Sequence, residues 1–404
     1  MLNSEFRILN SEFISSTFDL TFDPRPILHH LNRIFLFLLL ILIPGFSSAQ
    51  EKTGRDVDIV ICMDLSSSSN GLIDHFRNHL YDYWYFFNNC NPQPNYRIAF
   101  VAYARFGYGK KDGYTRVIKD LSTDFEKMSS VLFKIPSRTE KGDQYVGAAL
   151  NTCLKKISWS KSPDAIKMIF LVGNGDVTTG TVDIDVVMDK LIEQKITVHP
   201  VYVTAPGEKK VIRGWEKIAM KGGGKMSTIS IRNRYFDRLN GFDMARFRAL
   251  NRKFNATYLP YGAEGRLRLK RMQDDDTHMY IANTEGYRYR SLYKISDDYQ
   301  KKNANWDLVD LYYKNPVDFM KVDRTTMNDS CRRMTNQQLK AYIIYKKYER
   351  RKLSAMIAEM VINKGLKDKE EGKVVEKNMP TLDIVTLRTI SDILKQESIE
   401  STLP

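Results

Sequence analysis

The stretch VDIVICMDLSSS, residues 57–68, decides the fold. Its first seven residues are apolar except for Asp58, and a short apolar run of this kind is typical of a strand buried on both faces of a sheet. Asp64 and a run of serines follow the strand directly. Because ligands bind at the carboxyl ends of strands in open α/β sheets, these polar residues mark the edge where a site is expected.

Apolar runs alternate with amphipathic helices from residue 55 to residue 232. Helices are predicted at 71–87, 146–155 and 182–194, and further strands at 96–103, 115–121, 166–172, 197–203 and 226–230. This alternation is typical of parallel strands with helices on both faces. The sequence therefore predicts an α/β domain with a doubly wound, Rossmann-like parallel sheet.

The loop after the first strand carries a D-x-S-x-S motif, formed by Asp64, Ser66 and Ser68. The strand, the spacing and the position resemble the von Willebrand factor type A (VWA) domain, a family that holds a divalent cation in a metal-ion-dependent adhesion site. Hydroxyl and carboxylate oxygens suit a hard cation such as Mg²⁺, Mn²⁺ or Ca²⁺. Serine is also a favoured helix N-cap, so the motif alone leaves a capping role open.

Two further loops depart from the family pattern. The family has a Thr in the second loop, where this chain reads KGDQY at 141–145 and places Asp143 near that position. In the third loop, GNGD at 173–176 places Asn174 where the family has an Asp. Since carboxylate and amide oxygens can both face Mg²⁺ or Ca²⁺, the resemblance implies a partly degenerate metal site made by Asp64, Ser66, Ser68, Asp143 and Asn174.

The resemblance implies a binding or adhesion module rather than an enzyme. An acidic side chain of a protein partner would complete the metal shell. The alternative is a structural scaffold of the cell envelope whose metal site is empty. No motif for catalysis opposes this interpretation, because the chain has no GxSxG elbow and the glycines at 222–224 lack the ending of a phosphate-binding loop.

Other metal and redox sites are not predicted. His75 and His79 have the i, i+4 spacing that can chelate zinc, yet the sequence offers no third ligand nearby, so two ordinary helix histidines are expected. The four cysteines lack metal-ligand spacing. Cys90 and Cys331 lie in polar, loop-like segments, and their pairing stays open.

Residues 1–49 are predicted to be an extension plus a signal peptide. The apolar run IFLFLLLILI at 34–43 is shorter than the ~20 residues that span a bilayer, and Ser47 and Ala49 favour cleavage before Gln50. The protein is thus expected to be exported to the periplasm, the cell surface or the medium. An uncleaved membrane anchor is the alternative.

Residues 233–404 are predicted to form a mainly α-helical, charged C-terminal domain after a VWA domain at 55–232. Helices are expected at 242–254, 266–290, 342–362 and 381–396, a buried anchor at 306–310 and a charged connector at 364–377. The net charge of +14 has no nucleic-acid reading motif beside it. A basic helix face of Lys346, Lys347, Arg350 and Arg351 is expected to be solvated, with a peripheral contact to an anionic envelope surface as the alternative.

Overall fold

The computed structural model describes residues 54–69, 71–137, 142–204, 209–230, 242–282, 284–370 and 380–401. They all belong to one compact unit, Thr53–Pro404. The predicted leader at 1–49 and the predicted domain boundary at 232 lie outside the described residues. Within the described ranges, no helix combines the length and apolar character needed to cross a membrane.

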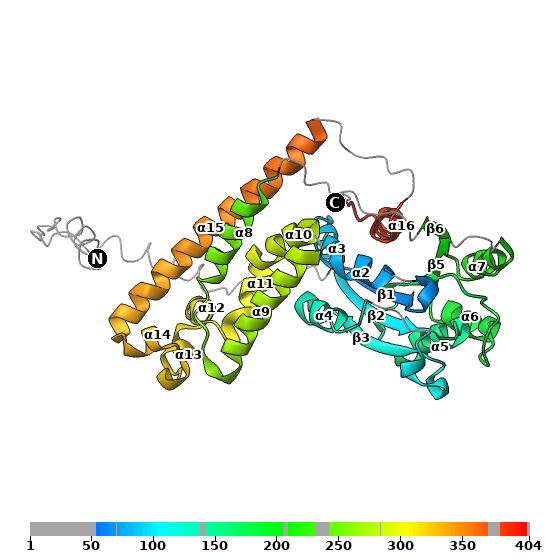
Figure 1. Ribbon diagram of the computed structural model, residues 1–404, viewed down its shortest axis with the longest axis horizontal. Helices are drawn as coiled ribbons and strands as arrows, with labels where there is room; N and C mark the ends of the chain where they lie inside the picture. The colour runs from blue at the N-terminus through cyan, green and yellow to red at the C-terminus, as the bar shows by residue number, and fades with distance from the viewer. Residues whose placement is uncertain are drawn as a thin grey trace, which may run out of the picture. The chain divides into compact units, whose positions relative to one another are not determined.

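A six-stranded sheet forms the first half of the chain, in the order β3-β2-β1-β4-β5-β6 (Figure 1). The strands are β1 (Asp56–Asp64), β2 (Asn95–Tyr103), β3 (Arg116–Ser122), β4 (Ile166–Gly173), β5 (Ile196–Thr204) and β6 (Ser227–Ser230). All neighbouring pairs are parallel except β2 and β3, which are antiparallel. The doubly wound prediction is confirmed, and the expectation of a wholly parallel sheet is wrong at this edge. The link between β2 and β3 holds only the short turns η2 (Phe106–Tyr108) and η3 (Lys110–Asp112), with no helix to make a parallel crossover.

The chain reverses its direction of growth across the sheet between β1 and β4. It first builds outward through β2 and β3, and then returns to add β4, β5 and β6 on the other side of β1. Such a switch point opens a crevice at the carboxyl ends of the two strands. Met63 pairs with Val172 in register, so Asp64 and Gly173 end neighbouring strands at this point.

Alternate residues of β1 enter two different cores, because side chains along a strand point to opposite faces. Ile59 and Ile61 face α2 (Leu72–Asn78), α3 (Leu80–Asn88) and α4 (Phe125–Leu132). Val60 and Cys62 face α5 (Val146–Lys156), α6 (Ile184–Glu193) and α7 (Lys209–Lys221). The single helix predicted at 71–87 is two helices, since the chain breaks at His79 with φ −106° and ψ 13°.

The second half of the chain is helical. Its helices are α8 (Met244–Asn255), α9 (Gly262–Ala282), α10 (Thr284–Ile295), α11 (Asp297–Lys302), α12 (Leu308–Lys314), α13 (Pro316–Met320), α14 (Asp329–Arg333), α15 (Asn336–Glu370) and α16 (Leu382–Gln396). The helix predicted at 266–290 is thus split between α9 and α10, and α15 runs into the predicted connector as far as Glu370. Residues 371–379 of that connector lie outside the described residues.

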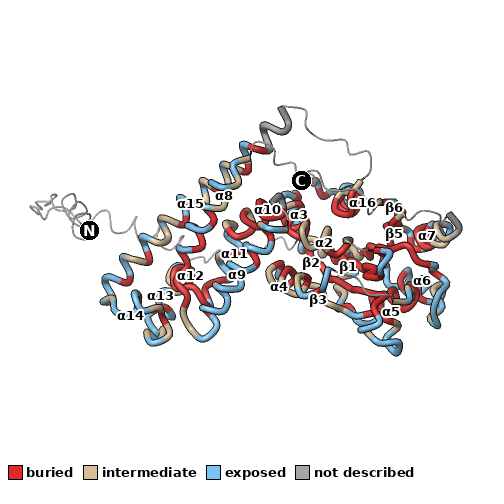
Figure 2. The backbone as a smooth tube through the Cα atoms, in the orientation of Figure 1, coloured by how far each residue is buried: buried red, intermediate tan, exposed pale blue. Residues whose placement is uncertain are grey.

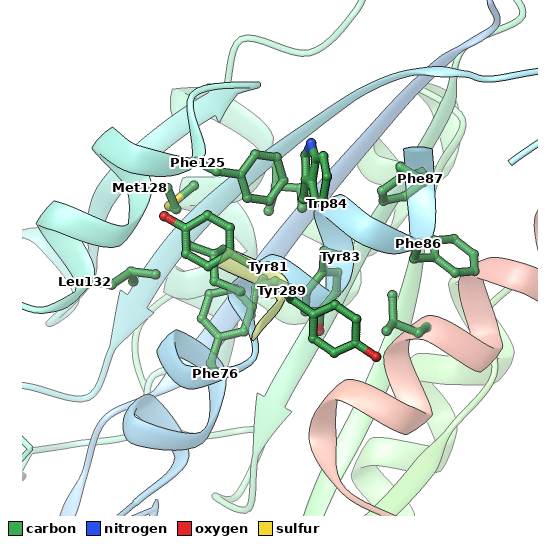
Figure 3. Close-up of a cluster of buried hydrophobic side chains, with 14 of the residues drawn as sticks. Phe76, Tyr81, Tyr83, Trp84, Phe86, Phe87, Phe125, Met128, Leu132 and Tyr289 are labelled. Carbon is green, nitrogen blue, oxygen red and sulfur yellow. The ribbon is translucent and has the colours of Figure 1, made fainter. Parts of the chain in front are cut away.

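The helical half shares a continuous core with one face of the sheet. Buried positions follow the central strands and continue into α3 and α10 (Figure 2). Tyr289 of α10 lies among the aromatic side chains of α3 in Figure 3, with its ring 5.0 Å from that of Tyr85. Tyr293 of α10 similarly packs 5.3 Å from Tyr81. These contacts hold α10 against α3.

Two expectations about buried side chains need correction. Arg350 does not belong to an exposed basic face, because it is fully buried and bonds Asp307 at 3.0 Å and Asp310 at 2.9 Å. The anchor segment that supplies both aspartates is buried as predicted. Cys90 and Cys331 are buried, free thiols, and Cys331 lies in α14 rather than in a polar loop.

Candidate functional site

The serine loop folds back on the carboxylate that ends β1. Asp64 is fully buried, and its Oδ1 accepts a hydrogen bond of 2.7 Å from the Ser66 amide. This bond closes the turn and brings the hydroxyls of Ser66 and Ser68 within 2.9 Å of each other. The serines do not cap the next helix, since the N-cap of α2 is Gly71 and no side chain caps it. Both hydroxyls therefore remain with the Asp64 cluster.

The loop after β4 completes one side of the cluster. Ser68 donates to Oδ1 of Asn174 at 3.0 Å, which joins the first and third predicted loops. Gly173 makes this approach feasible: a Cβ there would lie 2.3 Å from the Tyr103 hydroxyl and 3.0 Å from Cβ of Asp64. Only a glycine fits between these groups.

Gln144 supplies the centre of the cluster. Its Nε2 lies 2.5 Å from Oδ2 of Asp64, and 3.0 Å from each of three further oxygens, those of Ser66, Ser68 and Asn174. The amide has only two hydrogens for these four acceptors. One nitrogen is therefore surrounded by side-chain oxygens from both loops.

Asp143 does not join the cluster. The structure brings four of the five predicted residues together, namely Asp64, Ser66, Ser68 and Asn174, and contributes Gln144 from the second loop. Asp143 is exposed, and its backbone carbonyl accepts a bond of 3.1 Å from the Tyr145 amide. Asp143 and Gln144 are adjacent polar side chains in KGDQY, and spacing alone does not identify the one that points inward.

The electrostatics of the cluster depend on one acidic group. Burial raises the pKa of Asp64, and hydrogen bonds from Ser66, Ser69 and Gln144 oppose that rise. The remaining oxygen donors are neutral hydroxyls and amides. Asp64 therefore provides the single formal negative charge among the clustered side chains.

The oxygen atoms have the spacing that a small hard cation requires. Neighbouring oxygens of Ser66, Ser68 and Asn174 lie 2.9 and 3.0 Å apart. Octahedral Mg²⁺ with bonds of about 2.1 Å places adjacent ligand oxygens about 3.0 Å apart. The donor set thus fits Mg²⁺ in chemistry and spacing, while its single negative charge favours weak binding.

A second group of potential ligands lies on α2 and α16. The sequence offered no third ligand for His75 and His79, but the fold brings Asp383 to them. Nε2 of His75 lies 2.7 Å from Oδ1 of Asp383, although the two residues are 308 positions apart. The expectation of two isolated helix histidines is therefore wrong.

A family match agrees with this fold. A family model of the von Willebrand factor type A domain matches residues 58–240. No curated protein matches the chain. Three solved structures are similar to it in part.

The first is an aerotolerance-related membrane protein from Bacteroides fragilis, with 14% identity, 45% of this chain and 94% of that chain covered, and a TM-score of 0.32. A von Willebrand factor type A protein from Catenulispora acidiphila has 17% identity, covers 44% and 39%, and has a TM-score of 0.32. Proximal thread matrix protein 1 from the mussel byssus, with a zinc-occupied MIDAS motif, has 16% identity, covers 44% and 42%, and has a TM-score of 0.32. Residues 58–240 thus match the von Willebrand factor type A domain family in sequence, and the doubly wound sheet occupies this part of the chain.

Proposed function

We propose that the protein is a protein-binding module that engages its partner at the loop cluster of Asp64, Ser66, Ser68, Gln144 and Asn174. Domains of this family generally serve as interaction modules and not as enzymes. One observation carries the proposal: side-chain oxygens from two loops converge at the switch point of the sheet. Ser68 is exposed, so a partner can reach the cluster from solvent.

A divalent cation is part of the proposal. Asp64, Ser66, Ser68 and Asn174 would hold Mg²⁺, Mn²⁺ or Ca²⁺, and the ion would supply a positive centre for an acidic side chain of the partner. Asp143 lies beyond these oxygens, and we assign it to the rim of the binding surface. The partner is thus a protein that presents an Asp or Glu in an accessible loop.

Gln144 can replace a cation as the partner of the oxygen atoms in the cluster. With Nε2 inward, the amide donates to the oxygens of the cluster without any cation. A carboxamide carries an oxygen beside its nitrogen, so the opposite orientation would present an acceptor to a cation. We infer that the cation competes with the Gln144 amide, which makes its binding weak.

The hydrogen bond from Gln144 to Asp64 also favours a second candidate function. Because Gln144 already bonds Asp64, the domain could act as a scaffold of the cell envelope with no cation in this site. In that case the partner would bind elsewhere on the molecule. The two functions differ in whether partner binding needs the metal and Asp64.

The experiment is affinity capture from envelope extracts with Mg²⁺ or with EDTA. The bait is the wild-type protein, Asp64→Ala, or the control Asp176→Ala. Asp176 is an exposed carboxylate of the third loop, and among the described residues the hydrogen bonds to its carboxylate come from Thr178. The binding module predicts partners that are lost with EDTA and with Asp64→Ala but kept with Asp176→Ala. Partners retained under all conditions would support the scaffold, and the absence of any partner would contradict both.

Export completes the proposal. The apolar run at 34–43 and the small residues before Gln50 support secretion through a cleaved signal peptide, and would place the partner in the envelope or outside the cell. Amino-terminal sequencing of the mature protein tests this, with Gln50 as the expected first residue. A peripheral contact with an anionic surface would use exposed cations of α15 such as Arg351 and Lys352, without Arg350.

A further inference from the structure

Two histidines and an aspartate meet where α16 packs on α2. One ligand atom from each of His75, His79 and Asp383 lies within 4.8 Å of the others. Besides the bond from His75 to Asp383, Nδ1 of His79 lies 3.7 Å from Oδ2 of Asp383. The two imidazole rings stack with centroids 4.5 Å apart. Residues from opposite ends of the chain thus present three metal-binding groups to one point.

The cluster is built into the protein rather than spread over its surface. The side chains of His79 and Asp383 are only 3% and 7% exposed, and that of His75 is 18% exposed. Thr381 donates a hydrogen bond of 2.5 Å to Oδ1 of Asp383 and so fixes the carboxylate at the start of α16. The more exposed edge of His75 leaves a route from solvent to the cluster.

Asp82 orients one of the histidines from behind. Its Oδ2 lies 2.8 Å from Nδ1 of His79, and Asp82 itself is buried. A metal-bound histidine almost always has a carboxylate or carbonyl on its other ring nitrogen, which fixes the tautomer and strengthens the ligand. Because Asp82 holds Nδ1, the metal would bind His79 through Nε2, and the pair of Asp82 and His79 then has this arrangement.

We propose that His75, His79 and Asp383 bind one Zn²⁺ ion that fastens α16 to α2. Two imidazoles and one carboxylate suit zinc better than Mg²⁺, which prefers oxygen ligands alone. Bonds of about 2.0–2.1 Å in a tetrahedral site place ligand atoms about 3.4 Å apart. Nε2 of His75 and Oδ1 of Asp383, which lie 2.7 Å apart, therefore separate slightly around the ion, and ligand atoms of the group that lie up to 4.8 Å apart move closer. A water molecule on the exposed side of His75 completes the tetrahedron.

The zinc strengthens an attachment that already has other contacts. Tyr83 and Thr386 share a hydrogen bond of 2.5 Å between their hydroxyls, and Asn91 and Glu400 exchange backbone bonds of 2.8 and 2.9 Å. These contacts keep α16 in place without metal. Zinc therefore adds stability to a fold that forms in its absence, and the zinc-free protein can be studied directly.

The test is a calorimetric titration of Zn²⁺ into the full chain, with Mg²⁺ in excess and Asp64 replaced by Asn to exclude the other site. We expect one Zn²⁺ per chain with a micromolar or lower Kd, and a higher melting temperature with zinc. His75→Gln and His79→Asn should each weaken binding at least about 100-fold, and Asp82→Asn, which leaves all three ligands intact, about 10- to 100-fold. His278→Gln, at an exposed histidine on α9, should bind zinc like the parent protein.

Asp383→Asn removes an ion pair as well as a ligand, so the histidine variants decide the result. Their zinc-free forms should keep the circular dichroism spectrum of the parent. Co²⁺ should give the visible absorption of a tetrahedral site in the parent and lose it in His75→Gln. Absence of zinc binding to the parent, or zinc affinity in His75→Gln and His79→Asn equal to that of the parent, would overturn the proposal.

Discussion

Nε2 of Gln144 lies 2.5 Å from Oδ2 of Asp64, the buried carboxylate that ends β1. Burial of an ionised carboxylate is unfavourable unless it is paired or hydrogen-bonded. The Gln144 amide and the Ser66 amide supply those bonds from two loops. Gln144 therefore stabilises the cluster in the absence of a cation, and any cation must replace this contact.

Gly173→Ala should disturb the cluster through the backbone of β4. The new Cβ would clash with the Tyr103 hydroxyl and press on Cβ of Asp64, at 2.3 and 3.0 Å. Overpacking of this kind destabilises a protein by about 1–3 kcal/mol. Urea unfolding monitored by tryptophan fluorescence measures the loss. An unchanged unfolding midpoint would show that the space between Gly173 of β4 and Asp64 of β1 can hold a methyl group.

Arg290→Met should destabilise the junction between the sheet domain and the helical half. Arg290 is fully buried on α10, where it bonds Asp276 at 2.8 Å and Glu126 of α4 at 3.3 Å. Removal of one partner of a buried ion pair costs about 3–5 kcal/mol, because the remaining charges stay buried. Equilibrium urea unfolding gives this value.

The matched control for that variant is Arg268→Met. Arg268 lies on α9 with a side chain that is 42% exposed, and it pairs with Glu264 at 3.1 Å. An exposed pair of this kind contributes less than about 1 kcal/mol. Equal effects of the two substitutions would contradict the role of Arg290 at the junction.

His199 should make the stability of the sheet domain depend on pH. Burial lowers its pKa to about 4 from an ordinary value of 6.5. Its Nδ1 accepts a bond of 3.1 Å from the Lys225 amide, so the neutral ring is the form that the fold holds. Between pH 6.5 and about 4 the unfolded chain takes up a proton that the folded one does not, and stability falls as the pH falls.

The size of this effect follows from the same shift. Each pH unit in the window lowers the free energy of unfolding by up to about 1.4 kcal/mol. The wild type should therefore lose about 2 kcal/mol more than His199→Gln between pH 7 and pH 5. Parallel stability profiles for the two proteins, measured by urea unfolding, would refute the assignment.

The strands were predictable because each central strand is an apolar run of nearly its true length. The run at 57–63 is one residue shorter than β1 at each end, and the run at 166–172 is one residue shorter than β4 at its carboxyl end. The antiparallel direction of β3 was not predictable in this way, since a strand has the same hydrophobic pattern in either direction. The antiparallel direction of β3 follows instead from the short connection between β2 and β3, which contains no α-helix.

The site was predictable only as far as local spacing reaches. Asp64, Ser66 and Ser68 lie at the end of β1 and in the loop after it, and Asn174 directly follows the neighbouring strand β4. The inward direction of Gln144 depends on the turn before α5, and the position of Asp383 depends on the docking of α16. Sequence spacing contains neither relationship. The burial of Arg350 likewise depends on contacts with another helix: Asp307 is the N-cap of α12, and Asp310 lies in its first turn.

Competition between Gln144 and a cation at Asp64 is tested by a calorimetric titration of Mg²⁺ into the wild type, Gln144→Thr and Asp64→Ala. Gln144→Thr removes the competing amide and adds a hydroxyl oxygen. We expect weak, millimolar binding by the wild type, binding at least about tenfold tighter by Gln144→Thr, which corresponds to about 1.4 kcal/mol, and no binding by Asp64→Ala. Equal affinities for the wild type and Gln144→Thr, or Mg²⁺ binding by Asp64→Ala, would contradict the account.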